Sequence, residues 1–183
     1  MSQTLNYRGA AGMDDTEAFN ARTTIRWKGD MLFRIFFYND RLFFIKVGGS
    51  KQNQAAIHFG LIGAIVNHFA QKRAARKTQE KIASIAGIAP STLLGQDKVN
   101  SAIEVSQITE PTLNPKSFWS STPYGSFTFR NEKGKKKVFK FDEGPQFRVA
   151  EQKLAEVFGD RLVVKARWDD VKGKVVKVES ARL

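Results

Sequence analysis

Residues that could do acid–base or metal chemistry are few in this sequence, and their spacing does not favour such chemistry. The chain has only two histidines, His58 and His68, and no cysteine. On one helix these histidines would have Cα atoms about 15 Å apart, which is too far for one metal ion. No HExxH motif surrounds them, and the lack of cysteine excludes a thiolate zinc site and a cysteine nucleophile. We therefore interpret both histidines as boundary residues of a helix and expect no metal site.

Neighbouring carboxylates also lack a catalytic arrangement. The adjacent pairs fall near chain ends, turns or helix starts: Asp14-Asp15, Asp142-Glu143 and Asp169-Asp170. A carboxylate just before Pro145 is better placed to stabilise a helix N-terminus than to transfer a proton. The segments Gly48-Gly49 and Gly60-x-x-Gly63 lack the Lys-Ser/Thr pair of a phosphate-binding loop and the context of a dinucleotide site. The sequence thus predicts no catalytic residue, no cofactor and a protein that is not an enzyme.

Positive charge is the strongest chemical signal in the chain. The formal net charge of +12 favours anionic partners such as nucleic acid, anionic lipid headgroups or acidic proteins. Much of this charge is concentrated in residues 72–81 and 130–140. The candidate residues for binding an anion or a partner are Lys72, Arg73, Arg76, Lys77, Lys81, Arg130, Lys133, Lys135, Lys136 and Lys137. For each cluster the alternative is a solvated face that only keeps the protein soluble.

The stretch FGLIGAIVNHFAQKRAARK, residues 59–77, changes from apolar to basic near residue 70. An apolar period of about 3.6 residues from about residue 54 to 86 predicts a helix. The basic side chains that follow Phe69 occupy the same sector of this helix as the apolar ones before it. We therefore expect the first half to be buried against protein and the basic half to extend into water. Insertion of the apolar half into a bilayer surface is the alternative.

The segments before this helix have the pattern of β-strands. RTTIRWKGD alternates apolar and polar residues, and MLFRIFFYNDRLFFIKV contains two aromatic and branched runs on either side of Asn39-Asp40. Because Asn-Asp is favoured in tight turns, these runs predict an antiparallel hairpin. Phe33, Ile35 and Phe37 are expected to share one face of it.

The β pattern resumes after Gly87 and Pro90, which end the helix. SAIEVSQIT predicts a strand, EPTLNPKSFWSSTP predicts a loop, and YGSFTFRNEKGKKKVFKF predicts a hairpin that turns at residues 131–134. DEGPQFRVAEQKLAEVFG predicts a helix with Pro145 in its first turn and Gly159 at its end. DRLVVKARW predicts a further strand, whereas residues 169–183 fit either a short hairpin or a tail.

These elements predict one α+β domain with an insertion. We divide the chain into a flexible N-terminal segment (1–20), a β-domain (21–168) that contains a helical insertion (54–88), and a C-terminal extension (169–183). The N-terminus lacks the apolar run of a secretory signal, and no stretch reaches the roughly 18–20 apolar residues of a spanning helix. We expect a cytoplasmic protein that is at most peripheral to a membrane.

Two segments resemble the pleckstrin-homology (PH)-like superfold, including bacterial PH-like and GRAM-like domains. FRIFFYNDRLFFIKVGG (33–49) resembles the hairpin of these domains, and residues 103–162 resemble their second half. The resemblance implies an antiparallel β-sandwich or open barrel capped by a C-terminal helix, here with a long helix inserted between strands. It also implies a non-enzymatic binding module. Family members that bind phosphoinositides gather Lys and Arg in the first hairpin loop, whereas the loop here, Lys28-Gly29-Asp30, carries an acid.

Our hypothesis is a PH-like binding or scaffold module that engages an anionic membrane surface or a protein partner through its basic clusters. The alternative is a nucleic-acid-binding protein that uses hairpin 130–140 and helix arm 72–81 with salt-dependent affinity. Self-association through helix 54–70 is a further expectation, because Gly60, Gly63 and Asn67 form a sector that another helix could approach closely. Close packing of the helix on its own sheet would explain the same three residues.

Overall fold

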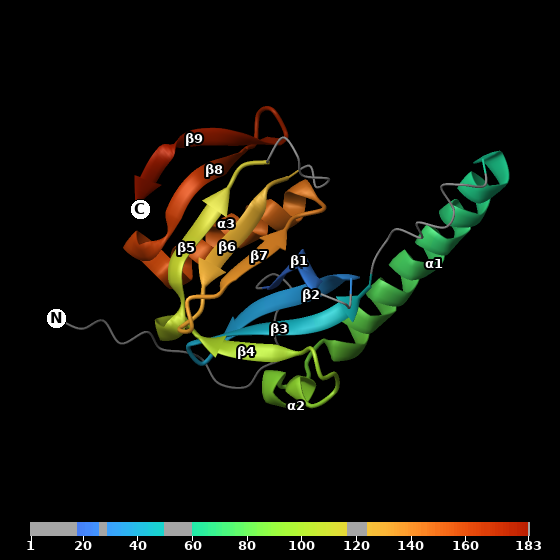
Figure 1. Ribbon diagram of the computed structural model, residues 1–183, viewed down its shortest axis with the longest axis horizontal. Helices are drawn as coiled ribbons and strands as arrows, with labels where there is room; N and C mark the ends of the chain where they lie inside the picture. The colour runs from blue at the N-terminus through green and yellow to red at the C-terminus, as the bar shows by residue number, and fades with distance from the viewer. Residues whose placement is uncertain (1–17, 26–28, 50–59, 117–123, 183) are drawn as a thin grey trace.

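The computed structural model describes residues 18–25, 29–49, 60–116 and 124–182, with side chains described for all of these except 60–71 and 180–182. Within them the chain is an α+β protein built on one open, mostly antiparallel sheet of nine strands in the order β4-β3-β2-β1-β7-β6-β5-β8-β9 (Figure 1). The strands are β1 (Ala18–Ile25), β2 (Gly29–Tyr38), β3 (Arg41–Gly48), β4 (Ser101–Glu104), β5 (Thr109–Asn114), β6 (Ser126–Arg130), β7 (Lys136–Lys140), β8 (Val163–Asp169) and β9 (Lys174–Arg182). The helices are α1 (Gly60–Ile85), α2 (Pro90–Leu94) and α3 (Gly144–Phe158). The expectation of a sheet-rich α+β fold with a long helix inserted between strands is confirmed.

The first half of the sheet is the antiparallel series β1 to β4. The predicted hairpin is confirmed, because β2 pairs with β3 from Leu32↔Gly48 to Tyr38↔Arg41. Its turn residues Asn39 and Asp40 have φ values of 47° and 57°. Positive φ at both central residues is the requirement of a type I′ turn, and Asn and Asp tolerate it better than most residues.

The second half of the sheet is built by β5, β6 and β7, and β8 and β9 extend it. The predicted β6–β7 hairpin is confirmed, with Phe127 directly opposite Phe139. Helix α3 follows β7 and buries a stripe of four side chains at helical spacing: Phe147, Ala150, Leu154 and Phe158. Strand β8 then pairs with β5 in parallel, and β9 pairs with β8 as the edge strand at this end of the sheet. The last segment of the chain is therefore a hairpin arm and not a tail.

Aromatic rings join the two halves of the sheet. Backbone pairing between β1 and β7 is limited to Arg22↔Lys140 in the described part of the chain. Beside this bridge, the Phe44 ring from β3 stacks on Phe139 from β7 with centroids 4.8 Å apart, and on Phe129 from β6 at 6.0 Å. The three side chains are at most 5% exposed. The two halves of the sheet are thus joined mainly by side-chain packing between them.

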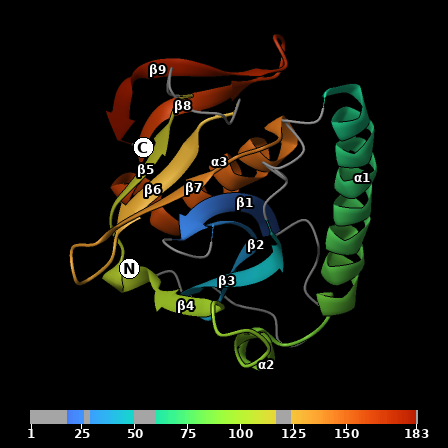
Figure 2. The ribbon, with the colours of Figure 1, turned by 45° about the vertical axis from the view of Figure 1, so that its right-hand side comes forward.

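Helices α1 and α2 cover the opposite face of the first sheet half. Ile85 of α1 and Leu93 of α2 pack on a second buried cluster that includes Phe36, Phe43 and Ile45. Both faces of β2 and β3 are therefore buried, which explains why these strands read as nearly continuous apolar runs. The backbone of the first half of α1 continues past the edge of the sheet (Figures 1 and 2).

This arrangement of α1 corrects one expectation. Among the described side chains, contacts to the sheet come from the C-terminal part of the helix, at Thr78, Ile82 and Ile85, and therefore from the half that also carries the basic residues. We expected the basic half to extend away from the sheet. A Cβ at Gly48 would lie only 2.8 Å from the Thr78 Oγ1, so glycine allows this close approach of α1 to β3. The predicted helix start at 54–59 and the side chains of 60–71 lie outside the described residues.

Two other expectations differ from the structure. The segment predicted as a proline- and serine-rich loop contains strand β5, and the strand predicted over 101–109 ends at Glu104 and continues as a short 3₁₀ turn, Val105–Gln107. Pro111 lies where the β5–β6 register is interrupted, between Thr109 and Thr112. Proline is tolerated in a strand at such an irregularity, and this is why its presence did not prevent strand formation.

Truncation of the central aromatic ring tests this account of the fold. Phe44→Ala should lower the free energy of unfolding by about 3–5 kcal/mol, because it removes a buried ring and leaves a cavity between the two sheet halves. The measurement is urea-induced unfolding of both proteins. Tyr38→Ala, on the same hairpin but 41% exposed, is the control and should cost less than about 1 kcal/mol. Equal losses in the two variants would contradict the role given to Phe44.

Candidate functional site

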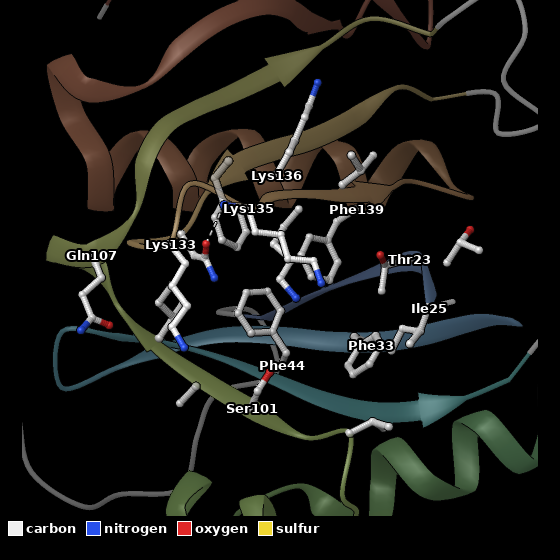
Figure 3. A pocket seen from close by; sticks show the side chains of 18 of the residues that line it. Thr23, Ile25, Phe33, Phe44, Ser101, Gln107, Lys133, Lys135, Lys136 and Phe139 are labelled. Carbon is white, nitrogen blue, oxygen red and sulfur yellow. Dashed lines mark hydrogen bonds between the residues drawn. The ribbon is translucent and has the colours of Figure 1, made fainter. Parts of the chain in front are cut away.

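A cleft of about 1160 Å³ opens between β7 on one side and β3 and β4 on the other (Figure 3). Its base is aromatic and consists of Phe33, Phe44, Phe129 and Phe139. Half-buried apolar side chains also line the cleft: Ile25, Val99, Ala102, Ile103 and Val138. We call this space the lysine cleft, because five lysines line its rim.

The lysine cleft exists because β1 and β7 diverge. Their single paired position, Arg22↔Lys140, lies at one end of the cleft, and the following residues of β1 (23–25) and the preceding residues of β7 (136–139) line it. Two strands that run side by side without pairing leave a gap between two sheet edges. The cleft is therefore a break in the sheet whose base is closed by the aromatic stack.

The rim of the lysine cleft carries one sign of charge almost throughout. Five lysines line it against one acid, Glu132; the lysines are Lys133, Lys135, Lys136, Lys137 and Lys140. Because side chains alternate along a strand, Lys137 lies on the same face of β7 as the inward-facing Phe139. Lys136 lies on the opposite face, and its side chain points away from the aromatic base (Figure 3).

The hairpin turn holds the backbone beneath these lysines in one conformation. The Asn131 N–H donates to the Lys135 carbonyl (3.1 Å), and the Lys135 N–H donates to the Asn131 Oδ1 (2.9 Å). The Gly134 N–H donates to the Asn131 carbonyl at 2.8 Å, and Gly134 has a φ of 69°. Four lysines predicted as site residues, those at 133 and 135–137, are thus presented by an ordered turn and strand.

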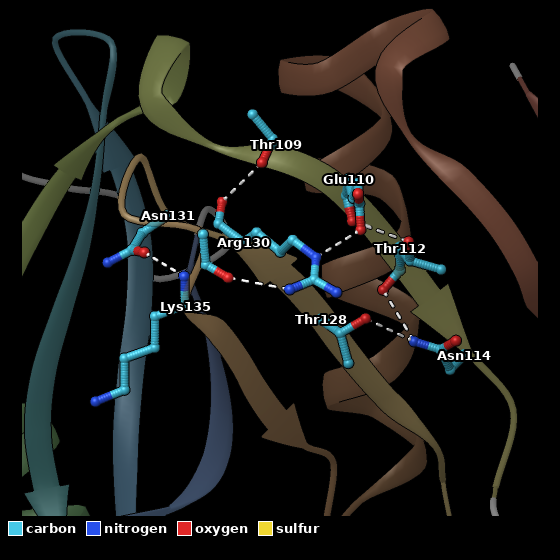
Figure 4. Close-up of polar contacts among 9 residues, drawn as sticks. Thr109, Glu110, Thr112, Asn114, Thr128, Arg130, Asn131 and Lys135 are labelled. Atoms are coloured by element: carbon cyan, nitrogen blue, oxygen red, sulfur yellow. Dashed lines mark hydrogen bonds and ion pairs between the residues drawn. The ribbon is translucent and has the colours of Figure 1, made fainter.

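Arg130 does not belong to the lysine cleft. Its Nε donates to the Glu110 Oε2 at 2.9 Å, and its Nη1 donates to the Gly134 carbonyl at 3.0 Å (Figure 4). These contacts turn the guanidinium toward β5, on the other side of the hairpin. Although Arg130 was predicted as a site residue with its lysine neighbours, the structure places it in a hairpin-to-β5 ion pair.

A second cleft, of about 810 Å³, lies between the basic part of α1 and the start of α3. Lys72 and Lys77 line it together with Arg22, Asp142 and Glu143. The Arg22 Nε and Nη2 both lie 2.9 Å from the Asp142 Oδ2, and its Nη1 donates to the Gly49 carbonyl at 3.0 Å. Because two carboxylates lie among these cations, the charge of this cleft is mixed.

The other predicted cations of α1 lie outside both clefts. Arg76 pairs with Glu80 one helical turn later (3.2 Å), Lys81 donates to the Gln96 Oε1 (3.2 Å), and Arg73 is exposed. Both ribbon views place α1 and the β6–β7 turn on opposite sides of the molecule (Figures 1 and 2). The ten predicted residues therefore do not form one site.

Sequence reasoning missed several residues of the lysine cleft. Lys140 was counted in the basic run 130–140 but was not proposed as a site residue, and Gln107, Thr23 and Phe44 were not considered as lining residues. The charge pattern that selected Lys135–Lys137 applies equally to Lys140. No local pattern shows that β3 and β1 face that run.

Two carboxyl groups, one on α3 and one at the end of β8, have shifted pKa values. Burial raises the pKa of Glu151, on α3, above its ordinary value of 4.5, although its Oε2 accepts a hydrogen bond from the Trp168 N–H at 2.9 Å. A hydrogen bond from the Lys172 N–H holds the pKa of Asp169 below its ordinary value of 3.8. Neither group lines the lysine cleft.

Within the described residues, no group of three or more His, Cys, Asp or Glu side chains is arranged to hold a metal ion. The helices in this part of the chain are all too short or too polar to cross a bilayer.

Comparisons of the chain with protein-family models, with curated proteins and with solved structures give no match.

The raised pKa of Glu151 predicts a specific pH dependence of stability. The folded state binds a proton here more readily than the unfolded chain, so stability from this group is present below pH 4.5 and is lost as pH rises through the folded pKa. Glu151→Gln keeps an acceptor for the Trp168 N–H and should raise the free energy of unfolding at pH 7 but not at pH 4. Denaturant unfolding at both pH values checks this.

The exposed Glu179 provides the control for this measurement, since Glu179→Gln makes the same chemical change on β9. This variant should leave the difference in the free energy of unfolding between pH 4 and pH 7 as it is in the unchanged protein. A stability gain from Glu151→Gln that is the same at both pH values would contradict the assignment.

Proposed function

We propose that this protein is a non-enzymatic, PH-like binding module that engages an acidic protein partner through the lysine cleft. The strand order β4-β3-β2-β1-β7-β6-β5, followed by a helix after β7, supports the PH-like part of the proposal. Proteins that share such a fold bind different ligands, because the ligand is selected by the residues of the binding site. The kind of partner therefore follows from the residues of the cleft.

One observation carries the proposal: five lysines surround a concave cleft that contains a single acid. Like charges gathered on one rim repel one another, and an acidic ligand relieves this repulsion when it binds. A concave surface also focuses the field and raises the local concentration of anions. The mixed charge of the second cleft gives no comparable preference.

A protein segment fits this site better than a flat bilayer does. Membrane binding by surface charge needs cations that project toward one plane. Here the cations of α1 and of the β6–β7 turn lie on opposite sides of the molecule, so one plane cannot meet both (Figures 1 and 2). The lysines also surround a hollow, which a narrow segment can enter.

Nucleic acid fits the site less well for a different reason. Single-stranded nucleic acid is held by aromatic rings on which bases stack, together with cations along the backbone. The rings of the lysine cleft already stack on one another, and Phe44 and Phe139 are each only 5% exposed. Charge alone would leave only weak binding that salt abolishes.

Charge reversal at the rim tests the proposal. The double variant Lys135→Glu/Lys137→Glu should weaken binding of a fluorescein-labelled oligo-glutamate at least about tenfold, which corresponds to about 1.4 kcal/mol. The reason is that two attractive contacts at the rim become repulsive. Fluorescence anisotropy at moderate and at high salt is the measurement.

The matched control changes net charge by the same amount away from both clefts. Lys165→Glu/Lys177→Glu alters two exposed lysines on β8 and β9 and should leave the affinity within about threefold of the unchanged protein, since distant exposed charges are screened by salt. Equal losses in the two double variants would reject the lysine cleft as the site. Binding only to phosphatidylserine vesicles or to single-stranded DNA would reject the acidic protein partner.

A further inference from the structure

The edge of β7 that borders the lysine cleft has free backbone groups, and the hydrogen-bond pattern of the hairpin identifies them. In an antiparallel pair, residues alternate between those that bond to the partner strand and those that face away from it. The Asn131 N–H bonds to Lys135, and the Phe141 N–H bonds to Gly125, so the bonded positions of β7 toward β6 are the odd-numbered ones. The even-numbered positions turn their N–H and C=O groups to the other edge.

The pairing with β1 agrees with this pattern. Lys140, an even-numbered residue, is the position at which β7 pairs with Arg22 of β1. Beyond it the strands separate, and Lys136 and Val138 have no strand partner on this edge among the described residues. Each of these two residues therefore presents one N–H and one C=O to the cleft.

An extended polypeptide is the ligand that such an edge recognises. Addition of a strand to an open sheet edge satisfies the free N–H and C=O groups, and the flanking side chains select the sequence. The volume of about 1160 Å³ exceeds the ~300–1000 Å³ typical of small-molecule pockets and suits a chain segment.

The side chains around the edge define the composition of that segment. A strand presents successive side chains to opposite faces. Lys135 and Lys137, on the face of β7 that looks toward the aromatic base, favour carboxylates on the incoming chain, whereas the half-buried Val138, on the other face, favours an aliphatic side chain. The complementary sequence alternates acidic and aliphatic residues.

We infer that the lysine cleft binds an extended acidic segment of a partner protein as an added β-strand, which pairs with the β7 edge at Lys136 and Val138. This inference rests on the proposed function and adds to it a binding mode and a ligand sequence pattern. Charge attraction brings the segment to the cleft, and backbone pairing fixes its direction and register.

The first experiment separates backbone pairing from charge on the ligand side. The probe is a fluorescein-labelled peptide of alternating Glu and Val, and its control is an ester analogue in which each central amide N–H is replaced by an ester oxygen. Charge, side chains and extended shape are kept, whereas the N–H donors are lost. The analogue should bind the unchanged protein at least about tenfold more weakly, or about 1.4 kcal/mol.

The second experiment removes a donor on the protein side. Val138→Pro deletes one N–H that the fold itself does not use, and proline is tolerated on a strand edge that faces outward. It should weaken binding of the parent peptide about as much as the ester substitution does, whereas Val138→Thr keeps the N–H and should bind like the unchanged protein. Circular dichroism verifies that Val138→Pro is folded. The ester analogue is tested on the unchanged protein, so that result does not depend on how well a variant folds.

Amide hydrogen exchange gives an independent measure of register. On addition of the parent peptide, protection should rise at Lys136 and Val138 but not at Lys137, whose N–H is already turned to β6.

The outcomes distinguish this inference from the proposed function. If the ester analogue and Val138→Pro bind as tightly as their parents while Lys135→Glu/Lys137→Glu loses binding, strand addition is rejected and the acidic partner stands. If the parent peptide does not bind the unchanged protein at all, both are rejected.

Discussion

Three phenylalanine rings, Phe44, Phe129 and Phe139, hold the two halves of the sheet together at the point where β1 and β7 stop pairing. A backbone hydrogen bond contributes a net ~0.5–1.5 kcal/mol, whereas burial of one large apolar side chain contributes ~1.5–3 kcal/mol. The stack therefore compensates for the few ladder bonds that the divergence removes.

The same divergence leaves strand edges that water or a ligand must satisfy. An open edge invites pairing with any exposed strand, and proteins commonly limit this with lysines placed on the edge. The rim of the lysine cleft fits that role. Lys136, Lys137 and Lys140 repel basic strands by their charge, and pairing with a neutral strand would cost the free energy of desolvating these lysines. An acidic strand is the one kind that these lysines attract. In the proposed function, protection from aggregation and selection of an acidic partner are thus two consequences of one arrangement.

Local features of the fold were predictable from sequence, and features that depend on distant pairing were not. The turn at Asn39-Asp40 and the end of α3 at Gly159 follow from residues within a few positions of each other. Strand β5 was missed because Pro111 is compatible with a strand only where the neighbouring register is irregular, which no local pattern reveals. Basic residues of the β6–β7 hairpin were identified, but their joining with Phe44 and Thr23 into a cleft depends on where β7 leaves β1.

Net charge alone does not show where positive charge stays uncompensated in this fold. By count, the basic segment of α1 and the β6–β7 hairpin look equivalent. In the fold, Lys72 and Lys77 lie in a cleft with Glu143 and with Asp142, which is itself paired with Arg22, and Arg76 pairs with Glu80, so part of the field of α1 is cancelled locally. The hairpin lysines face only Glu132, and Arg130, the residue most able to bind a carboxylate with two bonds, is occupied by Glu110. In the proposed binding mode, lysines therefore attract the ligand. They act as point charges without a fixed geometry, so orientation must come from another source. The free backbone groups of β7 are the directional partners that the cleft offers.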